Sequence, residues 1–333
     1  MNRKYLLIGA VVATIAIFAI SVAVYVIPYE PMHPVVYIVY GSEKGDLSYT
    51  DSAYRGLFTA QEAMVFSKKE FTSLNYTKFS GLLDNLRGPE NPGLIITVGY
   101  IYADDTKRIA AEHPEIRFLA IDQTGIGSQN TQAYEITSFG ESYLAGVLAA
   151  SATKTHRVGI ILGTQSDLLE GFRQGYIAGV HAVDPSMTID QEYVRNNSFG
   201  GFSDPDRAED LAGGMYRNGA DVIYTVAGYS GLGTITEAKK APGRFVIGVD
   251  SDQTHLGPGV VIASAVKRVD RVVYTGIGEY LDGTFTGGNT VAGLNEGVTG
   301  LVFNPKFAAY NATVSAWEGK AREEEARYLA ARQ

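Results

Sequence analysis

Short apolar runs that alternate with segments of helical spacing constrain the fold of this chain more than any other feature. The runs, such as VVYIVY and GLIITV, are rich in β-branched and aromatic residues and are apolar over their whole length. Strands of this kind are typical of parallel sheets covered by helices on both faces. The strands that we expect are 35–40, 93–98, 117–121, 158–162, 221–226, 244–249 and 260–264. The helices that we expect are 52–67, 103–113, 140–153, 166–182, 205–218, 230–240 and 267–282.

The pattern divides into two similar halves, because residues 35–150 and 156–255 each read as a series of βα units. A chain of 333 residues with 45% hydrophobic and 19% charged residues can build two such halves. The segments ASATKTH at 150–156 and THLGPG at 254–259 are expected to be hinges. Two open parallel sheets that face each other bring the carboxyl ends of their strands to one cleft, where ligands bind.

Charge and cysteine content exclude several function classes. The net charge is −8 and no dense cluster of Lys and Arg occurs, which argues against nucleic acid as a partner. The chain has no cysteine, so disulfides, thiolate nucleophiles, zinc–thiolate sites and a lipid-modified cysteine are excluded.

The N-terminus predicts a membrane anchor. Arg3 and Lys4 precede a run of 23 uncharged residues at 5–27, which as a helix would be about 35 Å long and could cross a bilayer. Because no positive charge follows until Lys44, the remainder of the chain is expected on the extracellular side of the cell membrane. A cleaved signal peptide is the alternative, although the run ends without a clear small-x-small site. Residues 28–34 are expected to form a short stiff linker.

Polar and aromatic residues follow the expected strands, at the ends that would meet in the cleft. They are Asp46, Tyr49 and Thr50 after the first strand, Gly99, Asp122, Gly228 and Asp250 after later strands, and Lys267 at the start of the helix expected at 267–282. Carboxylates can accept hydrogen bonds from adjacent hydroxyls, aromatic rings can stack on a heterocycle, and glycines let backbone amides approach closely. The set therefore fits a neutral, flat ligand that carries hydroxyl groups.

Each of these residues also has a purely structural interpretation. Asp46 could cap the following helix, Tyr49 could be one of many surface rings, and Lys267 could lie on a solvated helix face. Catalytic and metal-binding motifs are lacking: the sequence has no Gly-x-Ser-x-Gly elbow, Walker loop, His-Glu-x-x-His or Gly-x-Gly-x-x-Gly after a strand. The five histidines are scattered, so we expect no catalytic residue, no bound metal and no cofactor.

Several motifs in a fixed order resemble the basic membrane protein family, the substrate-binding proteins of ABC transporters that include nucleoside receptors. The motifs are GDLSYTDSAYRGL, ESYLAGVLAA, VGIILG with GFRQGYIAGV, GGFSDPDRAEDLA, GADVIYTVAGYSGLG, VIGVDSDQ, SAVKRVD and GLNEGVTGLV. The resemblance runs from about residue 35 to residue 302.

The resemblance implies a type I periplasmic-binding-protein fold, which has two doubly wound α/β lobes joined by three crossovers with the ligand between them. We expect lobe 1 to comprise 35–152 with 258–288 and lobe 2 to comprise 153–257 with 289–318. A transmembrane helix at 1–27 would precede them, and a charged helix at 319–333 would follow.

The resemblance also implies roles for the site residues. Tyr49 and Phe202 would stack on the two faces of a nucleoside base, and Asp122 would face the base edge. Asp250 and Lys267 would bind the ribose, and Gly228 would let the backbone of the second lobe approach the sugar. One departure concerns the base: where the family pattern reads Asp-x-Ser-Phe-Asn, this chain reads Asp46-Leu-Ser-Tyr49-Thr50, so an amide that could read a base edge is replaced by a hydroxyl.

The function that these features predict is an extracytoplasmic receptor that captures a nucleoside, with a purine expected, and delivers it to ABC permease and ATPase subunits. Two alternatives belong to other classes. A membrane-anchored sensor would use the same binding domain but would need a signalling partner, because only residues 1–4 precede the anchor. A nucleoside-cleaving enzyme would need a catalytic base or metal-bound water, and the sequence offers no suitable Asp cluster.

Overall fold

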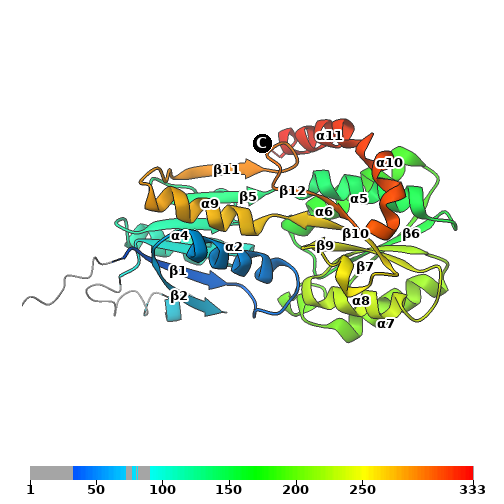
Figure 1. Cartoon of the computed structure of the whole chain (residues 1–333), viewed down its shortest axis with the longest axis horizontal. Helices are drawn as coiled ribbons and strands as arrows, with labels where there is room; N and C mark the ends of the chain where they lie inside the picture. The colour runs from blue at the N-terminus through cyan, green and yellow to red at the C-terminus, as the bar shows by residue number, and fades with distance from the viewer. Residues whose placement is uncertain (1–32, 73–76, 80, 82–90, 333) are drawn as a thin grey trace, which may run out of the picture. The chain divides into compact units, whose positions relative to one another are not determined.

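The structure, a computed structural model, describes residues 33–72, 77–79, 81 and 91–332. Residues from Pro34 onward form one compact unit that contains two six-stranded sheets with helices packed on both faces. Each sheet forms one layer together with its helices, and Figure 1 shows the two layers beside each other. The predicted α/β architecture with two mainly parallel sheets is confirmed. The predicted anchor at 1–27 and all of the linker up to residue 32 lie outside the described residues. Within the described part of the chain, no helix is long and apolar enough to cross a membrane.

The first sheet has the strand order β11-β5-β4-β3-β1-β2, and all its pairs are parallel. Its strands are β1 (Val35–Tyr40), β2 (Ser67–Thr72), β3 (Leu94–Val98), β4 (Arg117–Ile121), β5 (Thr131–Ile136) and β11 (Gly288–Ala292). The helices are α2 (Tyr49–Ala63), α4 (Ala103–Glu112) and α9 (Val269–Leu281). Alternate residues of β1 face opposite cores: Ile38 packs with α2 and α9, whereas Tyr37 packs with α4. This is why β1 is apolar at every position.

The second sheet has the order β12-β10-β9-β8-β6-β7, and only β12 is antiparallel to its neighbour among the described strands. Its strands are β6 (Arg157–Leu162), β7 (Thr188–Tyr193), β8 (Val222–Val226), β9 (Phe245–Asp250), β10 (Val261–Lys267) and β12 (Thr299–Phe303). Helices α5 (Phe139–Ala152) and α6 (Asp167–Val183) cover one face, and α7 (Pro205–Arg217) and α8 (Gly231–Ala238) cover the other.

In the described part of the chain, three connections pass between the two sheets. They follow β5, β10 and β11, and their residues are 137–138, 268 and 293–298. These positions correct the expected lobe boundaries. Helix α5 was expected in lobe 1, but it packs against α6 in the core of the second sheet. Residues 289–292 were expected in lobe 2, but as part of β11 they pair with β5 in the first sheet. The strand at 260–264 was expected in lobe 1, but it corresponds to β10, which pairs with β9 and β12 in the second sheet.

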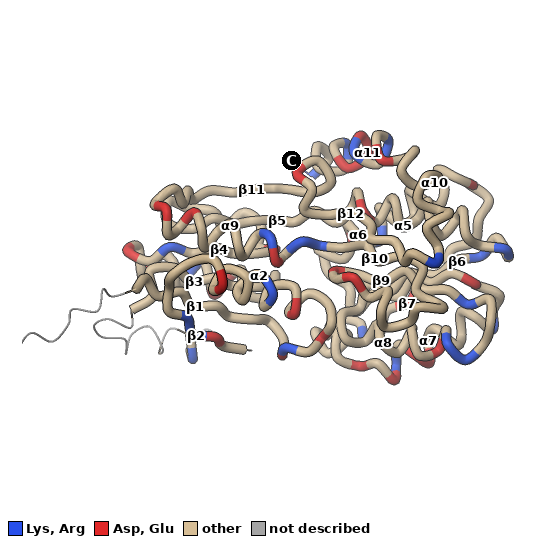
Figure 2. The backbone as a smooth tube through the Cα atoms, in the orientation of Figure 1, with Lys and Arg blue, Asp and Glu red and all other residues tan. Residues whose placement is uncertain are grey.

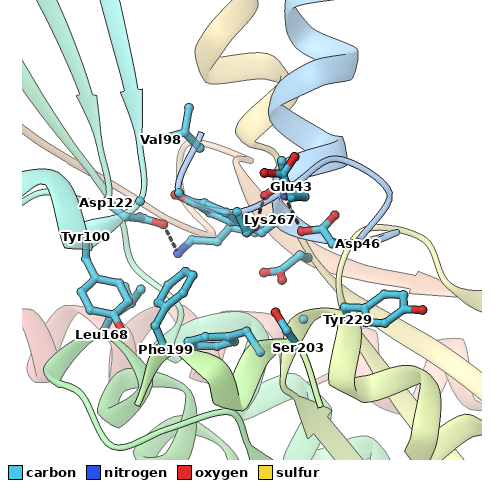
Figure 3. Close-up of a pocket in the computed structure, with 18 of the residues that line it drawn as sticks. Glu43, Asp46, Val98, Tyr100, Asp122, Leu168, Phe199, Ser203, Tyr229 and Lys267 are labelled. Atoms are coloured by element: carbon cyan, nitrogen blue, oxygen red, sulfur yellow. Dashed lines mark hydrogen bonds and ion pairs between the residues drawn. The ribbon is translucent and has the colours of Figure 1, made fainter. Parts of the chain in front are cut away.

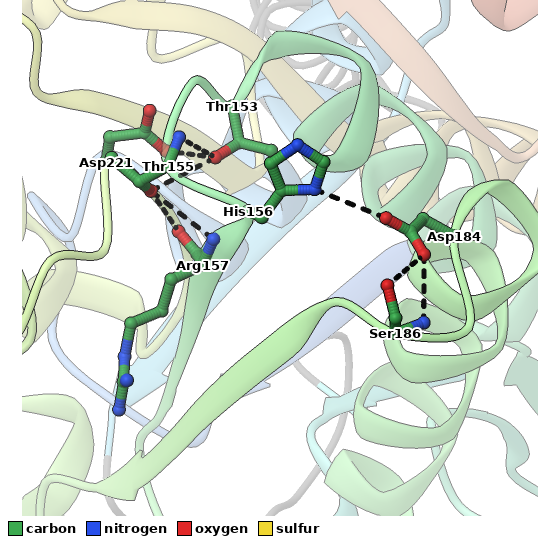
Figure 4. Close-up of polar contacts among 7 residues, drawn as sticks. All are labelled: Thr153, Thr155, His156, Arg157, Asp184, Ser186 and Asp221. Carbon is green, nitrogen blue, oxygen red and sulfur yellow. Dashed lines mark hydrogen bonds and ion pairs between the residues drawn. The ribbon is translucent and has the colours of Figure 1, made fainter.

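The segment expected to be the first hinge lies within the second layer, where side chains hold it (Figure 4). The Asp221 carboxylate accepts hydrogen bonds from the Thr153 hydroxyl at 2.5 Å and from the Lys154 amide at 2.6 Å. His156, which has a positive φ of 56°, places its ring 3.3 Å from Asp184. These contacts join the loop after α5 to the residue before β8 and to the end of α6, so the loop does not connect the two layers. The second expected hinge, at 254–259, joins β9 to β10 within the same sheet and does not connect the layers either.

The C-terminal segment packs on the outside of the second layer. It contains α10 (Asn311–Ser315) and the expected charged helix α11 (Glu318–Ala330), and α11 lies along α5 in Figure 1. Charges of both signs alternate along α11 and are interspersed over both layers in Figure 2. Although α11 carries many charges, one of its faces packs on α5, where the Tyr328 ring stacks on Phe139 with ring centroids 4.7 Å apart.

Candidate ligand-binding site

A cavity of about 620 Å³ lies where the carboxyl ends of strands from both sheets meet. We call it the main cavity. All nine residues that the sequence predicted as ligand contacts line it, and they are Asp46, Tyr49, Thr50, Gly99, Asp122, Phe202, Gly228, Asp250 and Lys267. The sequence reasoning therefore brought together residues that the fold also brings together. Whether each of them contacts a ligand stays a prediction.

The Asp46 carboxylate is directed at the beginning of α2. It accepts hydrogen bonds from the backbone amides of Ser48, Thr50 and Asp51 at 2.8–3.0 Å, which have no partner inside the helix. Burial raises the pKa of Asp46, and these three hydrogen bonds oppose the rise. The capping interpretation of Asp46 thus describes its contacts in this structure. Thr50 places its hydroxyl 2.6 Å from that of Ser42, so this hydroxyl also has a partner within the protein.

Asp250 ends β9 in the left-handed region, with φ of 61°, a conformation that Asp tolerates better than most residues. Its carboxylate accepts a hydrogen bond of 2.6 Å from the hydroxyl of Ser48, which belongs to the first layer. Burial raises the pKa of Asp250 to about 6, while the Ser48 hydrogen bond and the Lys267 charge lower it. A buried carboxylate with an elevated pKa is stabilised by further hydrogen-bond donors, which a hydroxylated ligand can supply.

Asp122 and Lys267 form a buried ion pair across the cavity wall (Figure 3). The Lys267 ammonium lies 2.7 Å from one Asp122 oxygen, and the other Asp122 oxygen accepts the Ile136 amide at 3.1 Å. Asp122 follows β4 with φ of 58°, and Lys267 ends β10, so the pair joins the two sheets. Both side chains are at most 2% exposed.

Aromatic rings surround this ion pair. The Lys267 ammonium lies 5.7 Å from the centre of the Tyr49 ring and 5.5 Å from that of Phe172. Phe199 lies between Phe202 and Tyr100, with ring centroids 5.1 and 6.3 Å away. Such rings can stack on a planar ligand. The Tyr49 hydroxyl is buried, and burial, followed by the Asp122 charge, raises its pKa.

Glycines allow the second layer to approach the cavity with its backbone. Gly228 has a positive φ of 54°, and a Cβ there would lie 3.5 Å from the Phe202 side chain. Gly201 is closer still to its neighbours, because a Cβ would meet the Gly163 carbonyl at 1.8 Å. A side chain at Gly201 would therefore displace the short helical turn that carries Phe202.

The two layers are in direct contact beside the cavity. Ser251 donates its hydroxyl to the Ser48 carbonyl at 2.7 Å and accepts from the Arg55 guanidinium at 2.9 Å. Gln253 donates its side-chain amide to the Leu47 carbonyl at 3.1 Å. The loop before α2 thus contacts both the cavity and the residues after β9.

The sequence reasoning missed the apolar part of the cavity wall. Leu168, Leu169 and Phe172 come from α6, and Phe199 comes from the turn before Phe202. Apart from Phe202, the predicted site residues lie at or after the ends of strands or begin a helix, whereas these side chains come from within a helix or a turn. Phe199 could have been predicted from the sequence, because it directly precedes the GGFSDPD motif and lies three residues before Phe202.

A sequence model of the family described as "ABC transporter substrate-binding protein PnrA-like" matches residues 33–325. The chain belongs to this family. The resemblance to basic membrane proteins is thereby confirmed, and the chain is a substrate-binding protein of the ABC transporter class and not an enzyme.

Relatives named in the curated comparison include basic membrane protein A1 of Borrelia garinii, 31% identical over 83% of this chain and 82% of its own length. The ABC transporter nucleoside-binding protein BmpA of Lactococcus lactis is also 31% identical, over 83% of this chain and 84% of its own. Among solved structures, a solute-binding protein of an ABC transporter system from Aeropyrum pernix superposes with a TM-score of 0.73. The two sequences are 28% identical, and the superposition covers 86% of this chain and 80% of the Aeropyrum pernix chain.

Proposed function

We propose that this family member captures a nucleoside, a purine by preference, in the main cavity and delivers it to the permease of an ABC importer. The observation that carries the proposal is the meeting of aromatic rings and buried carboxylates in one cavity. Tyr49, Phe172 and Phe202 offer flat apolar surfaces, and Asp250 and Lys267 offer groups for hydroxyls. The name of the Lactococcus lactis relative, a nucleoside-binding protein, agrees with this ligand class.

The polar half of the cavity fits a sugar with free hydroxyls. The Asp250 carboxylate has one hydrogen-bond donor among the described residues, the Ser48 hydroxyl, and retains further acceptor capacity for ligand hydroxyls. Hydrogen bonds to a carboxylate are stronger than those between neutral groups, so two adjacent hydroxyls would add affinity and orientation. Gly228 lines the same cavity and has no side chain to occupy the space beside the backbone of the second layer.

The aromatic half fits a base. Stacking on an aromatic ring contributes roughly 1–3 kcal/mol per base. Asp122 lies among the rings and could accept a hydrogen bond from an amino group at the base edge. Thr50 contributes less to base reading than an amide would, because its hydroxyl is already paired with Ser42.

Ligand capture would occur by rotation of the two lobes about the three connections between the sheets. The ligand would touch Tyr49 and Asp122 from the first layer and Phe202 and Asp250 from the second. A ligand that contacts both lobes only when they are close favours the closed state, which is the requirement for ligand-driven closure.

We also propose that the receptor is held at the extracellular side of the membrane by residues 1–27. The support is the uncharged run of 23 residues after Arg3 and Lys4 and the absence of a lipid-modifiable cysteine. The partners in this arrangement are the permease and ATPase subunits of the importer.

Calorimetric titration tests the proposed ligand class. Full-length protein in mild detergent, unfolded and refolded to remove carried ligand, is titrated with adenosine, guanosine, inosine, cytidine and uridine, and with ribose and free bases. We expect tight binding of at least one nucleoside, purines before pyrimidines, with much weaker binding of ribose or base alone. Tyr49→Ala and Asp250→Ala should each weaken binding. The absence of binding to every nucleoside would refute the ligand assignment and leave the fold intact.

A further inference from the structure

A second cavity of about 420 Å³ adjoins the main cavity, and we call it the accessory chamber. Tyr100, Asp122 and Leu168 line both cavities. Other walls of the chamber include Ala103, Thr124, Glu135, Ser138, Asp167 and Arg332. We propose that the chamber receives a hydrogen-bond-donating substituent, an amine or a hydroxyl chain, carried by the base of the bound nucleoside. The inference rests on the proposed function and extends it to base-modified nucleosides.

The aromatic end of the main cavity is the end that adjoins the chamber. Tyr100 contacts Phe199, and Figure 3 shows Tyr100, Leu168 and Phe199 grouped together. The Tyr49 and Phe172 rings lie around the Lys267 ammonium, which is bonded to Asp122. A planar base seated among these rings therefore presents an edge toward Asp122 and the chamber. Asp250, which would hold the sugar, lines the main cavity and not the chamber.

The chamber is large enough to hold a substituent. A space of about 420 Å³ corresponds to on the order of ten water molecules. Polar side chains contribute to its walls, among them Thr124, Glu135, Ser138, Asp167 and Arg332. A chain that ends in a donor could replace waters there and keep their hydrogen bonds.

The charges around the chamber favour a donor over an anion. Among the described residues, the carboxylates of Asp122, Glu135 and Asp167 line it against the single guanidinium of Arg332. Arg332 is already paired with Glu135, and Asp122 is paired with Lys267. An incoming phosphate or carboxylate would meet no free cation among the described residues that line the chamber and would be repelled, whereas an ammonium or hydroxyl would find acceptors.

The test compares each parent nucleoside with two derivatives in full-length protein. The parents are adenosine, guanosine and cytidine, and each carries on its exocyclic amino group either a 6-aminohexyl or a 5-carboxypentyl chain. We expect the aminohexyl derivative of a parent that binds to keep its affinity within about tenfold. The carboxypentyl derivative should bind more than about tenfold more weakly than the aminohexyl one.

Substitutions in the chamber wall, with one matched control, test whether the aminohexyl chain lies there. Ala103→Phe, at the partly buried first residue of α4, would fill part of the chamber without touching the main cavity. This substitution should weaken binding of the aminohexyl derivative by more than about tenfold and change the affinity for the parent nucleoside by less than about twofold. Ala111→Phe, at an exposed position of the same helix, is the matched control and should change neither. Thr124→Trp at the exposed side of the chamber repeats the test if Ala103→Phe does not fold.

The outcomes separate this inference from the proposed function. If the parent nucleoside binds but the aminohexyl chain lowers its affinity by more than about tenfold, the chamber assignment is overturned and nucleoside capture still stands. Equal effects of Ala103→Phe on parent and derivative also overturn it. If no parent and no derivative binds, the proposed function itself fails, and the chamber assignment fails with it.

Discussion

Lys267 and Asp122 form an ion pair of 2.7 Å that is almost completely buried and joins a strand of one sheet to the end of a strand of the other. The two residues are 145 positions apart in the sequence, and they lie at the ends of strands from different sheets. The pair therefore depends on the relative position of the two lobes, and it lies among the rings that would hold a base. Its loss should affect both stability and binding.

The first prediction concerns Lys267→Met, which leaves the Asp122 carboxylate buried without its cation. Breaking a buried pair by removing one partner costs about 3–5 kcal/mol. We expect a fall of this size in the free energy of unfolding, measured by urea titration. The double variant Lys267→Met/Asp122→Asn should recover part of the loss, because the uncompensated charge is gone. If Lys267→Met unfolds at the wild-type urea concentration, the pair does not have the assigned role.

The second prediction is a pH dependence of ligand affinity set by Asp250. Burial raises the pKa of Asp250 to about 6, and Asp46, Asp122 and Lys267 are the charged groups that face it. Ligand hydroxyls prefer the ionised carboxylate as acceptor. Affinity should therefore be full above pH 6 and fall by up to about tenfold per pH unit below it. Titration calorimetry from pH 5 to pH 7.5, in two buffers of different ionisation enthalpy, should also show proton release on binding.

Asp250→Asn is the control for this pH dependence, since an amide does not titrate. Its affinity should be lower at neutral pH and nearly constant over the same range. The stability of the unliganded protein depends on pH in the opposite direction, because the pKa of Asp250 in the folded state lies above the unfolded value near 3.8. The contribution of Asp250 to stability is thus greatest at low pH and is lost as pH rises through about 6. A wild-type affinity that does not change between pH 5 and pH 7.5 would contradict the assignment.

The third prediction separates capping from ligand contact at Asp46. Its carboxylate accepts three backbone hydrogen bonds at the beginning of α2. Asp46→Ala should reduce the free energy of unfolding by about 1–2 kcal/mol, as the loss of an N-terminal cap does. Asp46→Asn should reduce the free energy of unfolding by less, because the amide oxygen can still accept hydrogen bonds from these backbone amides. Unchanged stability in Asp46→Ala, together with lost binding, would instead assign the residue to the ligand.

The sequence predicted most of the central strands and the site residues at their ends because both follow from burial. The interior strand β5 (TQAYEI) was not predicted, because Tyr134 and Glu135 are only half-buried and interrupt its apolar run. Strand β3 is buried at all five positions, so its apolar run identifies it without structural information. Edge strands are harder: β2 (SKKEFT) and β7 (TIDQEY) are half-exposed and polar, and neither was predicted. Polar residues on an edge strand face water, and no apolar run then identifies the strand.

The position of α5 could not be predicted for a related reason. Almost every residue of α5 is buried, so its sequence has no polar face to indicate which layer it joins. Only the contacts with α6 and the second sheet place it there. In the site, Phe172 and Leu168 escaped prediction because helix residues reach the cavity only through the packing of α6 against the sheet.

The fourth prediction concerns Glu325 of α11, a buried carboxylate that contacts two of the three connections between the sheets. It accepts hydrogen bonds of 3.1 Å from the amides of Gly140, just after the first connection, and Leu294, within the third. Burial raises the pKa of Glu325, and these two bonds oppose the rise. Glu325→Ala should leave both amides without an acceptor and lower the free energy of unfolding by about 1–3 kcal/mol per amide.

Hydrogen exchange gives this prediction its sharpest measurement, because only the Gly140 and Leu294 amides should lose protection selectively. The neighbouring Glu324→Ala is the matched control, since Glu324 pairs with Lys320 and Arg327 on the outer side of the same helix. Exposed ion pairs contribute little, so Glu324→Ala should shift stability by less than about 1 kcal/mol and leave both amides protected. Equal exchange at Gly140 and Leu294 in the wild type and in Glu325→Ala would show that the helix does not hold these connections. Faster exchange in Glu325→Ala alone would establish that the C-terminal helix stabilises the segments about which the lobes must rotate.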